Sequence, residues 1–190
     1  MYKKISVTIT MTLVMAAILT VSSSAMQRSH AQGNGNFDNI LEIHNQERAA
    51  VHDATLDWST SLAADAKSYA QYLTTLGLSG SDRLPHCGTD GHPSCSGQGE
   101  NLSWCCTGGS PSHFSPANGV QRWAAEKSNY HGGPLTEADF APGVPMIGHY
   151  TQMVWKNTKE VGCATASSDT LAVLVCRYSP GGNYLNQSPY

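Results

Sequence analysis

Positive charge is scarce in this chain, and so is charge of either sign. Charged side chains make up 13% of the 190 residues, and 11 lysines and arginines face 14 aspartates and glutamates. Affinity for nucleic acid comes mainly from basic side chains that neutralise phosphates. The composition therefore excludes nucleic acid as an expected partner.

The chain also lacks an apolar run long enough to span a bilayer. Its most apolar stretch, Ile5 to Val21, is interrupted by serine and threonine and falls short of the roughly 20 apolar residues that a transmembrane helix needs. Two lysines precede this stretch, and Ser23 and Ala25 occupy the minus-three and minus-one positions of a signal-peptidase site. We predict a signal peptide over residues 1–25, with Ser29-His30-Ala31 as an alternative cut, and an extracellular, secreted protein.

Cleavage after Ala25 leaves about 165 residues with 9 basic and 14 acidic side chains, and thus a formal charge of −5. This length suits one domain with an ordinary core. Residues 26–36 include the glycine- and asparagine-rich sequence QGNGN, which predicts a flexible lead-in. We expect a single domain over residues 37–190, acting as a monomer.

Several catalytic and metal-binding signatures are missing from the sequence. There is no HExxH, which excludes the usual zinc-protease helix, and no GxSxG nucleophile elbow. No spaced pair of CxxC motifs occurs, so a cysteine-based structural zinc site is disfavoured. The six cysteines of a secreted chain instead predict disulfides.

The sequence narrows the disulfide pairing without fixing it. Cys163 and Cys176 flank a turn signal between two apolar runs, so we predict that they bond across a hairpin. Adjacent cysteines have Cα atoms only about 3.8 Å apart, closer than disulfide geometry usually allows, so a bond between Cys105 and Cys106 is not expected. Two pairings remain open: 87–105 with 95–106, or 87–106 with 95–105.

Periodicity and capping residues predict helices early in the chain and strands near its end. Three helices are expected to begin at Asp38, after Asp57 or Ser59, and at Ser115-Pro116. Residues 78–116 are rich in glycine, proline, serine and cysteine and predict long loops restrained by disulfides. A helical turn near Gly148 precedes two antiparallel strands, residues 161–165 and 171–178. These elements indicate an α+β layered domain.

Five short motifs, in this order, closely resemble the CAP superfamily: HNQER (44–48), GENL (99–102), WAAEKSNY (123–130), GHYTQMVW (148–155) and VCRYSPGGNY (175–184). That superfamily contains cysteine-rich secretory proteins, antigen 5 and the plant pathogenesis-related proteins of the first class. The similarity runs from about Phe37 to Tyr190. It implies secretion and a three-layer α-β-α sandwich with a central antiparallel sheet.

The resemblance also implies a cleft lined by two histidines and two glutamates. By position these are Glu100 of GENL, Glu126 of the third helix, His149 of GHYTQ, and His86, which ends the segment before the cysteine-bearing loop. His92, within that loop, is the alternative to His86. Two imidazoles and two carboxylates form a ligand set suited to zinc or another divalent cation. Within HNQER, Asn45 and Arg48 are expected to be structural, with the paired polar groups of the motif joining the first helix to the sheet by charge-assisted hydrogen bonds.

Three functional hypotheses follow. The resemblance to the plant pathogenesis-related branch implies a defence- or stress-related protein that binds a sterol or other small lipid and allows peripheral membrane contact. Loops between Thr107 and Asn118, with Phe114, are one expected border of an apolar groove. Alternatively, residues 180–190, PGGNYLNQSPY, are similar to the C-terminal segment that plant members release as a defence signal; otherwise residues 180–184 cover the sheet and residues 185–190 fray. A metal-dependent hydrolase ranks last, because no nucleophile is identifiable.

Overall fold

The computed structural model describes residues 37–89, 91–95, 97–106 and 113–190. The predicted signal peptide (1–25) and lead-in (26–36) lie outside the described residues. In chain order the elements are α1 (Asp38–Ala50), β1 (Asp57–Trp58), α2 (Thr60–Thr74), β2 (Gly99–Cys105), α3 (Pro116–Ala125), the 3-10 helices η2 (Glu126–Asn129) and η3 (Glu137–Phe140), α4 (Gly148–Met153), β3 (Glu160–Ser167) and β4 (Ala172–Ser179). Among the described helices, none is both long and apolar enough to cross a membrane.

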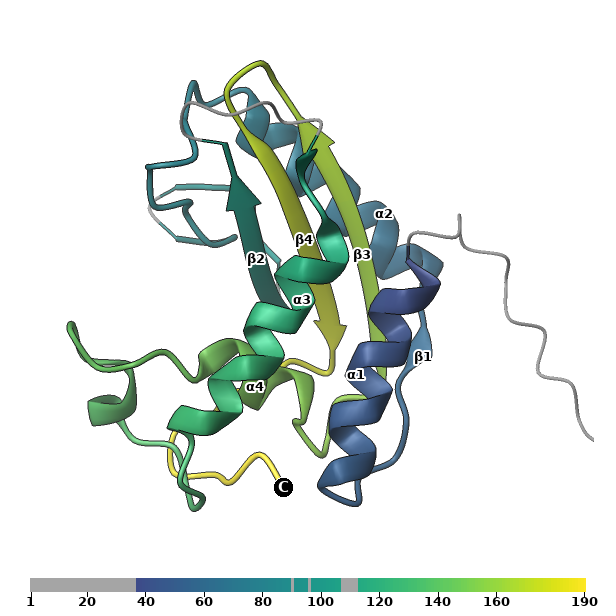
Figure 1. The fold of residues 1–190 in the computed structure, drawn as a ribbon, viewed down its shortest axis with the longest axis vertical. Helices are drawn as coiled ribbons and strands as arrows, with labels where there is room; N and C mark the ends of the chain where they lie inside the picture. The colour runs from purple at the N-terminus through teal and green to yellow at the C-terminus, as the bar shows by residue number, and fades with distance from the viewer. Residues whose placement is uncertain (1–36, 90, 96, 107–112) are drawn as a thin grey trace, which may run out of the picture. The chain divides into compact units, whose positions relative to one another are not determined.

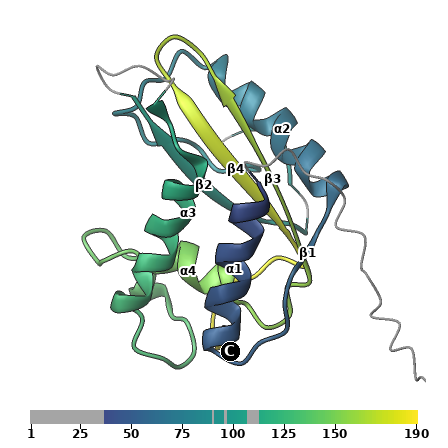
Figure 2. The same ribbon diagram turned by 45° about the vertical axis from the view of Figure 1, so that its right-hand side comes forward.

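The elements form three layers around one sheet (Figure 1). The strand order is β1-β3-β4-β2, with β4 antiparallel to both of its neighbours. Helix α2 covers one face of the sheet, and α1, α3 and α4 lie on the other, as the turned view in Figure 2 also shows. The predicted α+β, three-layer α-β-α architecture is confirmed. The sheet is mixed rather than wholly antiparallel, because the two-residue strand β1 runs parallel to β3.

Alternate side chains of strand β4 point to opposite faces of the sheet and so contribute to the hydrophobic cluster on each face. Residues 172–178 are all buried, as expected for a central strand covered on both faces. Leu174, Cys176 and Tyr178 pack with α1, α3 and α4, whereas Val173 and Val175 pack with α2. The strand therefore joins the two helical layers.

The three long helices begin where the sequence predicts. At α3, Ser115 is the N-cap and its Oγ accepts a hydrogen bond from the Asn118 N–H, while Pro116 occupies the first helical position. The buried stripe of α2 has the expected spacing, from Leu62 through to Leu73. The helical turn at Gly148 is present as α4.

The prediction of loops throughout residues 78–116 is wrong at β2. The seven residues of β2 pair along their whole length with β4, from Gly99 opposite Tyr178 to Cys105 opposite Ala172. The sequence GENLSWC has no β-branched residue, and Trp104 is its one residue of a strand-favouring type, so its intrinsic strand preference is low. Backbone pairing with the side of β4 that β3 leaves open therefore decides the conformation of this segment.

This strand also accounts for the error in the disulfide pairing. The structure pairs Cys87 with Cys95 and Cys105 with Cys106, in place of either expected arrangement. An extended strand of seven residues carries its end roughly 20 Å from its start, so Cys105 cannot reach the loop before Gly99. The adjacent pair has Cα atoms 3.7 Å apart, with Cys106 at φ 116°.

The third disulfide lies where the hairpin was predicted. Cys163 and Cys176 are register partners in β3 and β4, and their Cα atoms are 4.1 Å apart. The bond therefore crosses between directly opposed residues of two adjacent central strands, beneath α1 and α3. The predicted bond between Cys163 and Cys176 is confirmed.

The C-terminal segment, defined here as residues 180–190, is docked rather than frayed. The Lys156 N–H donates to the Pro189 carbonyl at 2.6 Å, only one residue from the chain end. The Tyr190 ring meets the Tyr130 ring edge-on with centroids 5.8 Å apart. The expectation that residues 185–190 fray is wrong, because backbone hydrogen bonds and ring contacts hold this part of the chain.

Candidate functional site

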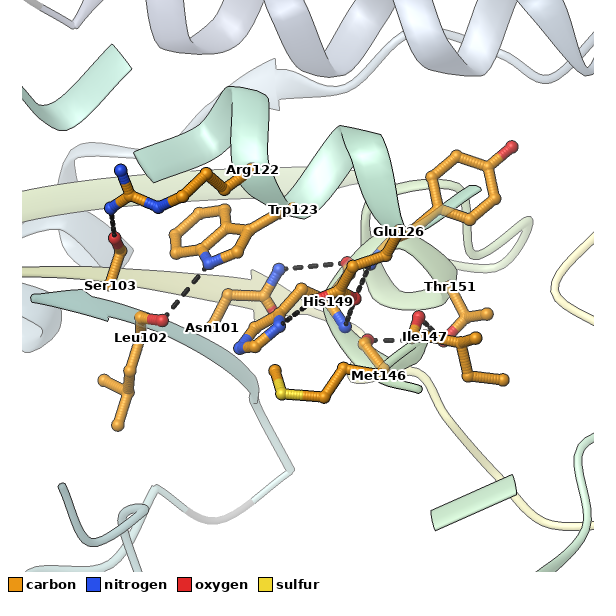
Figure 3. A network of polar contacts seen from close by, with 12 residues as sticks. Asn101, Leu102, Ser103, Arg122, Trp123, Glu126, Met146, Ile147, His149 and Thr151 are labelled. Carbon is orange, nitrogen blue, oxygen red and sulfur yellow. Dashed lines mark hydrogen bonds and ion pairs between the residues drawn. The ribbon is translucent and has the colours of Figure 1, made fainter. Parts of the chain in front are cut away.

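The first half of the site is a histidine–glutamate pair formed by α4 and η2. His149 Nδ1 lies 2.6 Å from Glu126 Oε1, and Glu126 Oε2 accepts the backbone N–H groups of His149 at 3.0 Å and Tyr150 at 3.2 Å (Figure 3). A carboxylate can only accept, so Nδ1 carries the proton in this contact. Glu126 thereby fixes both the His149 side chain and the first turn of α4.

The His149 ring is also held by an aromatic stack. In Figure 3 it lies under the Trp123 indole, with ring centroids 5.6 Å apart and planes inclined by 13°. The indole is itself anchored, because its Nε1 donates to the Leu102 carbonyl at 3.2 Å. Asn101 Nδ2 donates to the His149 carbonyl at 3.1 Å. Trp123 of α3 and Glu126 of η2 therefore hold the imidazole, and Asn101 of β2 holds the backbone that carries it.

The second half of the site is a histidine–glutamate pair at the start of β2. His86 Nδ1 lies 2.8 Å from Glu100 Oε1, which also accepts the Cys87 N–H at 3.0 Å. The second carboxylate oxygen pairs with the buried Arg177 guanidinium at 3.1 Å. Burial lowers the pKa of Arg177, while the Glu100 charge opposes that shift. The Arg177 charge thus compensates the charge of the Glu100 carboxylate, and the same carboxylate orients the His86 ring.

Both pairs border one cavity of about 650 Å³. His86, Glu100 and His149 lie in its lining, and Glu126 lies behind His149. Since each Nδ1 donates to a carboxylate, each neutral ring keeps an acceptor lone pair on Nε2. Neither Nε2 has a hydrogen-bond partner among the described residues. The cavity lining therefore has a polar part, called the floor here, with two imidazole nitrogens that are unpaired among the described residues; the His86 side chain is 47% exposed and that of His149 15%.

The rim of this cavity is apolar and open to solvent. Phe140, Val144 and Met146 line it and are 46%, 44% and 58% exposed. All three belong to the segment from η3 to α4, which also contributes Pro142 and Gly143. Large apolar side chains that are exposed together around a cavity are typical of a ligand-binding surface.

The four predicted cleft residues form two pairs rather than a single ligand cluster. Within the described part of the chain, no group of three or more histidine, cysteine, aspartate or glutamate side chains is placed to hold a metal ion. The carboxylates accept hydrogen bonds from imidazole and backbone N–H groups, as carboxylates that orient metal-binding histidines commonly do. His92, the alternative to His86, lies elsewhere: its Nδ1 is 2.7 Å from the Tyr72 hydroxyl.

A buried polar network links the site to α1, and sequence reasoning missed it. His44, fully buried, donates from Nδ1 to the Ile40 carbonyl at 2.7 Å, so its Nε2 accepts from the Tyr178 hydroxyl at 2.8 Å. Tyr178 in turn accepts from Asn101, which also donates to the His149 carbonyl. Burial lowers the pKa of His44 to about 4 and raises that of Tyr178. The HNQER motif contained this histidine, but only the fold reveals its partners.

Arg48 braces the other end of α4. Its guanidinium is fully buried and donates to the carbonyl oxygens of Ala54, Met153, Trp155 and Thr158. Asp53 lies 3.8 Å away and partly offsets the lowering of the Arg48 pKa by burial. The predicted charge-assisted bonds exist, but they join α1 to the segment after α4 instead of to the sheet.

Comparison with known proteins places this fold and site in a family. The family model described as the cysteine-rich secretory protein family, CAP, matches residues 41–178. This chain belongs to the CAP family. It is 36% identical over 176 residues to a pathogenesis-related protein of the PR-1 type from Sambucus nigra, covering 92% of this chain and 93% of that protein. It is 37% identical over 151 residues to pathogenesis-related protein 1 of Arabidopsis thaliana, covering 79% and 80%.

Solved structures of CAP proteins share the fold. Na-ASP-1 superposes with a TM-score of 0.65 at 24% identity, over 86% of this chain and 44% of the longer Na-ASP-1 chain. NaASP2, solved with Zn²⁺, gives a TM-score of 0.65 at 22% identity, over 83% and 86%. The predicted membership of the CAP superfamily, in its plant pathogenesis-related branch, is confirmed. The protein is thus a CAP protein of the pathogenesis-related, defence type.

Proposed function

We propose that this pathogenesis-related CAP protein is secreted and binds a sterol or another small lipid in the cavity that His86 and His149 line. The observation that carries the proposal is the combination of a polar floor with an exposed apolar rim in one cavity of about 650 Å³. Pockets for small molecules have volumes of roughly 300 to 1,000 Å³ and join apolar walls to a few fixed polar groups.

The floor selects for a hydroxyl group. The Nε2 atoms of His86 and His149 are acceptors when the rings are neutral, because each ring then keeps its proton on Nδ1 and donates a hydrogen bond to Glu100 or Glu126. A ligand hydroxyl, such as that of a sterol, can donate to one of them. A ligand that covers His149 Nε2 without donating to it would leave that nitrogen desolvated without a partner, which costs binding free energy.

The rim supplies the apolar contact. Phe140, Val144 and Met146 gain from covering a hydrocarbon body, because their side chains are now exposed to water. The sequence had suggested the loops between Thr107 and Asn118 for this role. Residues 107–112 lie outside the described residues, and Phe114 is half-buried against the α1–α3 core. The segment 139–146 is therefore our preferred apolar surface.

We propose the same floor for a divalent cation such as zinc, since imidazole nitrogens are donors that zinc takes, although no group of three or more histidine, cysteine, aspartate or glutamate side chains among the described residues is placed to hold one. Its protein ligands would be the Nε2 atoms of His86 and His149, with Glu100 and Glu126 orienting the rings. It would supply a positive charge at the base of the cavity. Two imidazoles alone leave a tetrahedral ion incomplete, so water or a ligand group must complete its coordination.

Binding is a better account of this cavity than hydrolysis. Among the described residues of its lining, none carries a hydroxyl, thiol or amine nucleophile. A hydrolase here would therefore depend on an activated water. We place the metal-dependent hydrolase behind lipid binding.

Secretion and a monomeric mature chain belong to the same proposal. Residues 1–25 have the pattern of a signal peptide, and three disulfides suit an oxidising, extracellular compartment. We propose that the mature chain acts as a monomer and that its apolar rim allows peripheral contact with a membrane while lipid is taken up.

The test is direct titration of the purified mature protein with dehydroergosterol, a fluorescent sterol. Saturable binding is expected for the wild type. Val144→Asp and Met146→Asp place a charge on the exposed rim, where the fold tolerates it, and are expected to weaken binding by about tenfold or more. Ala64→Asp is the control, since Ala64 is exposed on α2 and lies outside both the cavity lining and the C-terminal residues.

Two results would contradict the proposal. The first is an absence of saturable sterol uptake by the wild-type protein. The second is equal loss of affinity in Ala64→Asp and the rim variants, which would indicate general surface adsorption instead of a site.

A further inference from the structure

We propose that the C-terminal segment, residues 180–190, is part of the binding cavity, and that Asn183 is a positioning residue that holds the turn carrying His149. Docking of this segment and occupancy of the cavity are then linked. The role of Asn183 stands on contacts within the chain. The link to a ligand rests on the function proposed above.

Asn183 is the residue of the C-terminal segment that reaches the site. It lies in the cavity lining, its Nδ2 donates to the Gly148 carbonyl at 2.8 Å, and its Oδ1 accepts from Thr151 Oγ1 at 2.7 Å. These two partners are in the first turn of α4, on either side of His149. The backbone of Asn183 has φ 60°, a conformation that asparagine tolerates better than most residues.

The first turn of α4 is thus held by two side chains from distant parts of the chain. Glu126 of η2 binds its backbone N–H groups and the His149 ring, and Asn183 binds its Gly148 carbonyl and Thr151 hydroxyl. Helix α4 has only six residues, too few to be stable alone. The position of His149 therefore depends on both side chains.

Just before Asn183, two glycines let the backbone approach neighbouring groups too closely for any side chain. A Cβ at Gly182 would lie 2.6 Å from Trp155 Cγ, and a Cβ at Gly181 would lie 2.9 Å from the Gly99 nitrogen. The Gly182 N–H donates to Gln152 Oε1 at 2.8 Å. The glycine pair serves close approach of the backbone to neighbouring groups, and it places Asn183 against α4.

Backbone hydrogen bonds anchor the chain after Asn183 as well. The Leu135 N–H donates to the Gln187 carbonyl at 3.0 Å, and the Asn186 N–H donates back to Leu135 at 2.8 Å. The Lys156 N–H donates to the Pro189 carbonyl. Because Asn183 is fixed from both sides, it can transmit the docked state of the whole segment to the cavity.

These contacts link docking of residues 180–190 to ligand binding in the cavity. A ligand that contacts Asn183 and His149 in their docked positions must stabilise the docked segment. By thermodynamic reciprocity, docking must raise the affinity for that ligand by the same factor. Any process that detaches residues 180–190 will therefore weaken binding in the cavity.

Asn183→Gly tests the positioning role, and Asn186→Gly is its matched control. Both residues are asparagines of the same segment with positive φ, 60° and 64°, so glycine is tolerated equally at both. Asn186 is exposed. We expect amide hydrogen exchange over residues 148–154 to accelerate by about tenfold or more in Asn183→Gly alone. In the same variant, the His149 Nδ1 proton signal in NMR spectra should broaden while that of His86 stays sharp.

If Asn183→Gly and Asn186→Gly give the same exchange rates and the same His149 signal, the positioning role is refuted. A general loss of stability would broaden both histidine signals together and would also count against it. The line width of the His149 Nδ1 proton signal relative to that of His86 therefore separates a loss of positioning from a general loss of stability.

Dehydroergosterol tests the linkage. At about ten times its dissociation constant it should slow exchange of the Gly181 and Gly182 amides about tenfold, if only the docked state binds. Saturable binding without this protection overturns the linkage. No saturable binding by the wild type overturns the proposed lipid function, and the comparison of the two asparagine variants still decides the role of Asn183.

Discussion

The low pKa of the buried His44 predicts that the free energy of unfolding falls in acid. Its pKa falls from 6.5 to about 4 in the folded protein, chiefly through burial, so the unfolded chain binds a proton over a range where the native state does not. The contribution of His44 to stability is complete above pH 6.5 and declines as the pH falls towards 4. At 1.36 kcal/mol per unit, the total loss is about 3 kcal/mol.

Urea denaturation at a series of pH values between 7 and 4 measures this effect. Other groups also titrate in this range, so the informative quantity is the difference between wild type and His44→Gln, a neutral residue that can still hydrogen-bond to Tyr178. We expect the pH slope of the unfolding free energy to be smaller in the variant between pH 6.5 and 4. The NMR titration of the His44 ring in the wild type should independently show a neutral ring down to about pH 4. Equal slopes, or a ring that titrates near 6.5, would refute the reasoning.

Three further predictions concern the segments around α4. Gly182→Ala should lower the unfolding free energy by about 1–3 kcal/mol in urea denaturation, since its Cβ would clash with Trp155; an unchanged midpoint would contradict the close approach. Arg48→Met should cost about 3 kcal/mol or more, because four carbonyl groups lose their donor; a neutral effect in calorimetry would show that water replaces it. The Ser179–Pro180 bond should resist proteolysis in the folded protein, since the Ser179 carbonyl accepts the Lys159 N–H; mass spectrometry that finds this cut under fully native conditions, at the rate of the unfolded chain, would contradict this protection.

The third of these predictions bears on release of the C-terminal segment as a signal. The Pro180 carbonyl also accepts from Thr158 Oγ1 at 2.8 Å, so both residues of the bond are engaged. Release from the folded protein would therefore need local opening first. Because Asn183 lies in the cavity lining, such opening would disturb the site as well.

Local signals in the sequence account for the helices. Ser115-Pro116 carries its own start signal, and the apolar spacing in α2 specifies which side of that helix is buried. The hairpin of β3 and β4 follows from its apolar, β-branched runs and a turn. These features depend on neighbours within a few residues, so one sequence suffices to predict them.

The errors arise where distant segments decide the structure. Strand β2 forms because β4 offers an edge to it, and Gly99 and Cys105 give no local indication of a strand. The strand then separates the cysteines that the sequence analysis had paired. Asn183 was part of a motif used only for family resemblance, and its contact with Gly148 spans 35 positions. Positions 86, 100, 126 and 149 came from the resemblance, whereas their arrangement as two pairs required the fold.

In the proposed complex, a lipid hydroxyl donates to one of the two imidazole nitrogens of the cavity floor. The most direct measurement is an NMR titration of the ¹⁵N-labelled histidine rings with dehydroergosterol. We expect a saturable shift of the Nε2 resonance of His86 or of His149, and none at His92, which is bonded to Tyr72 outside the cavity lining. Saturable sterol binding that leaves both Nε2 signals unmoved, or that shifts His92 instead, would contradict it.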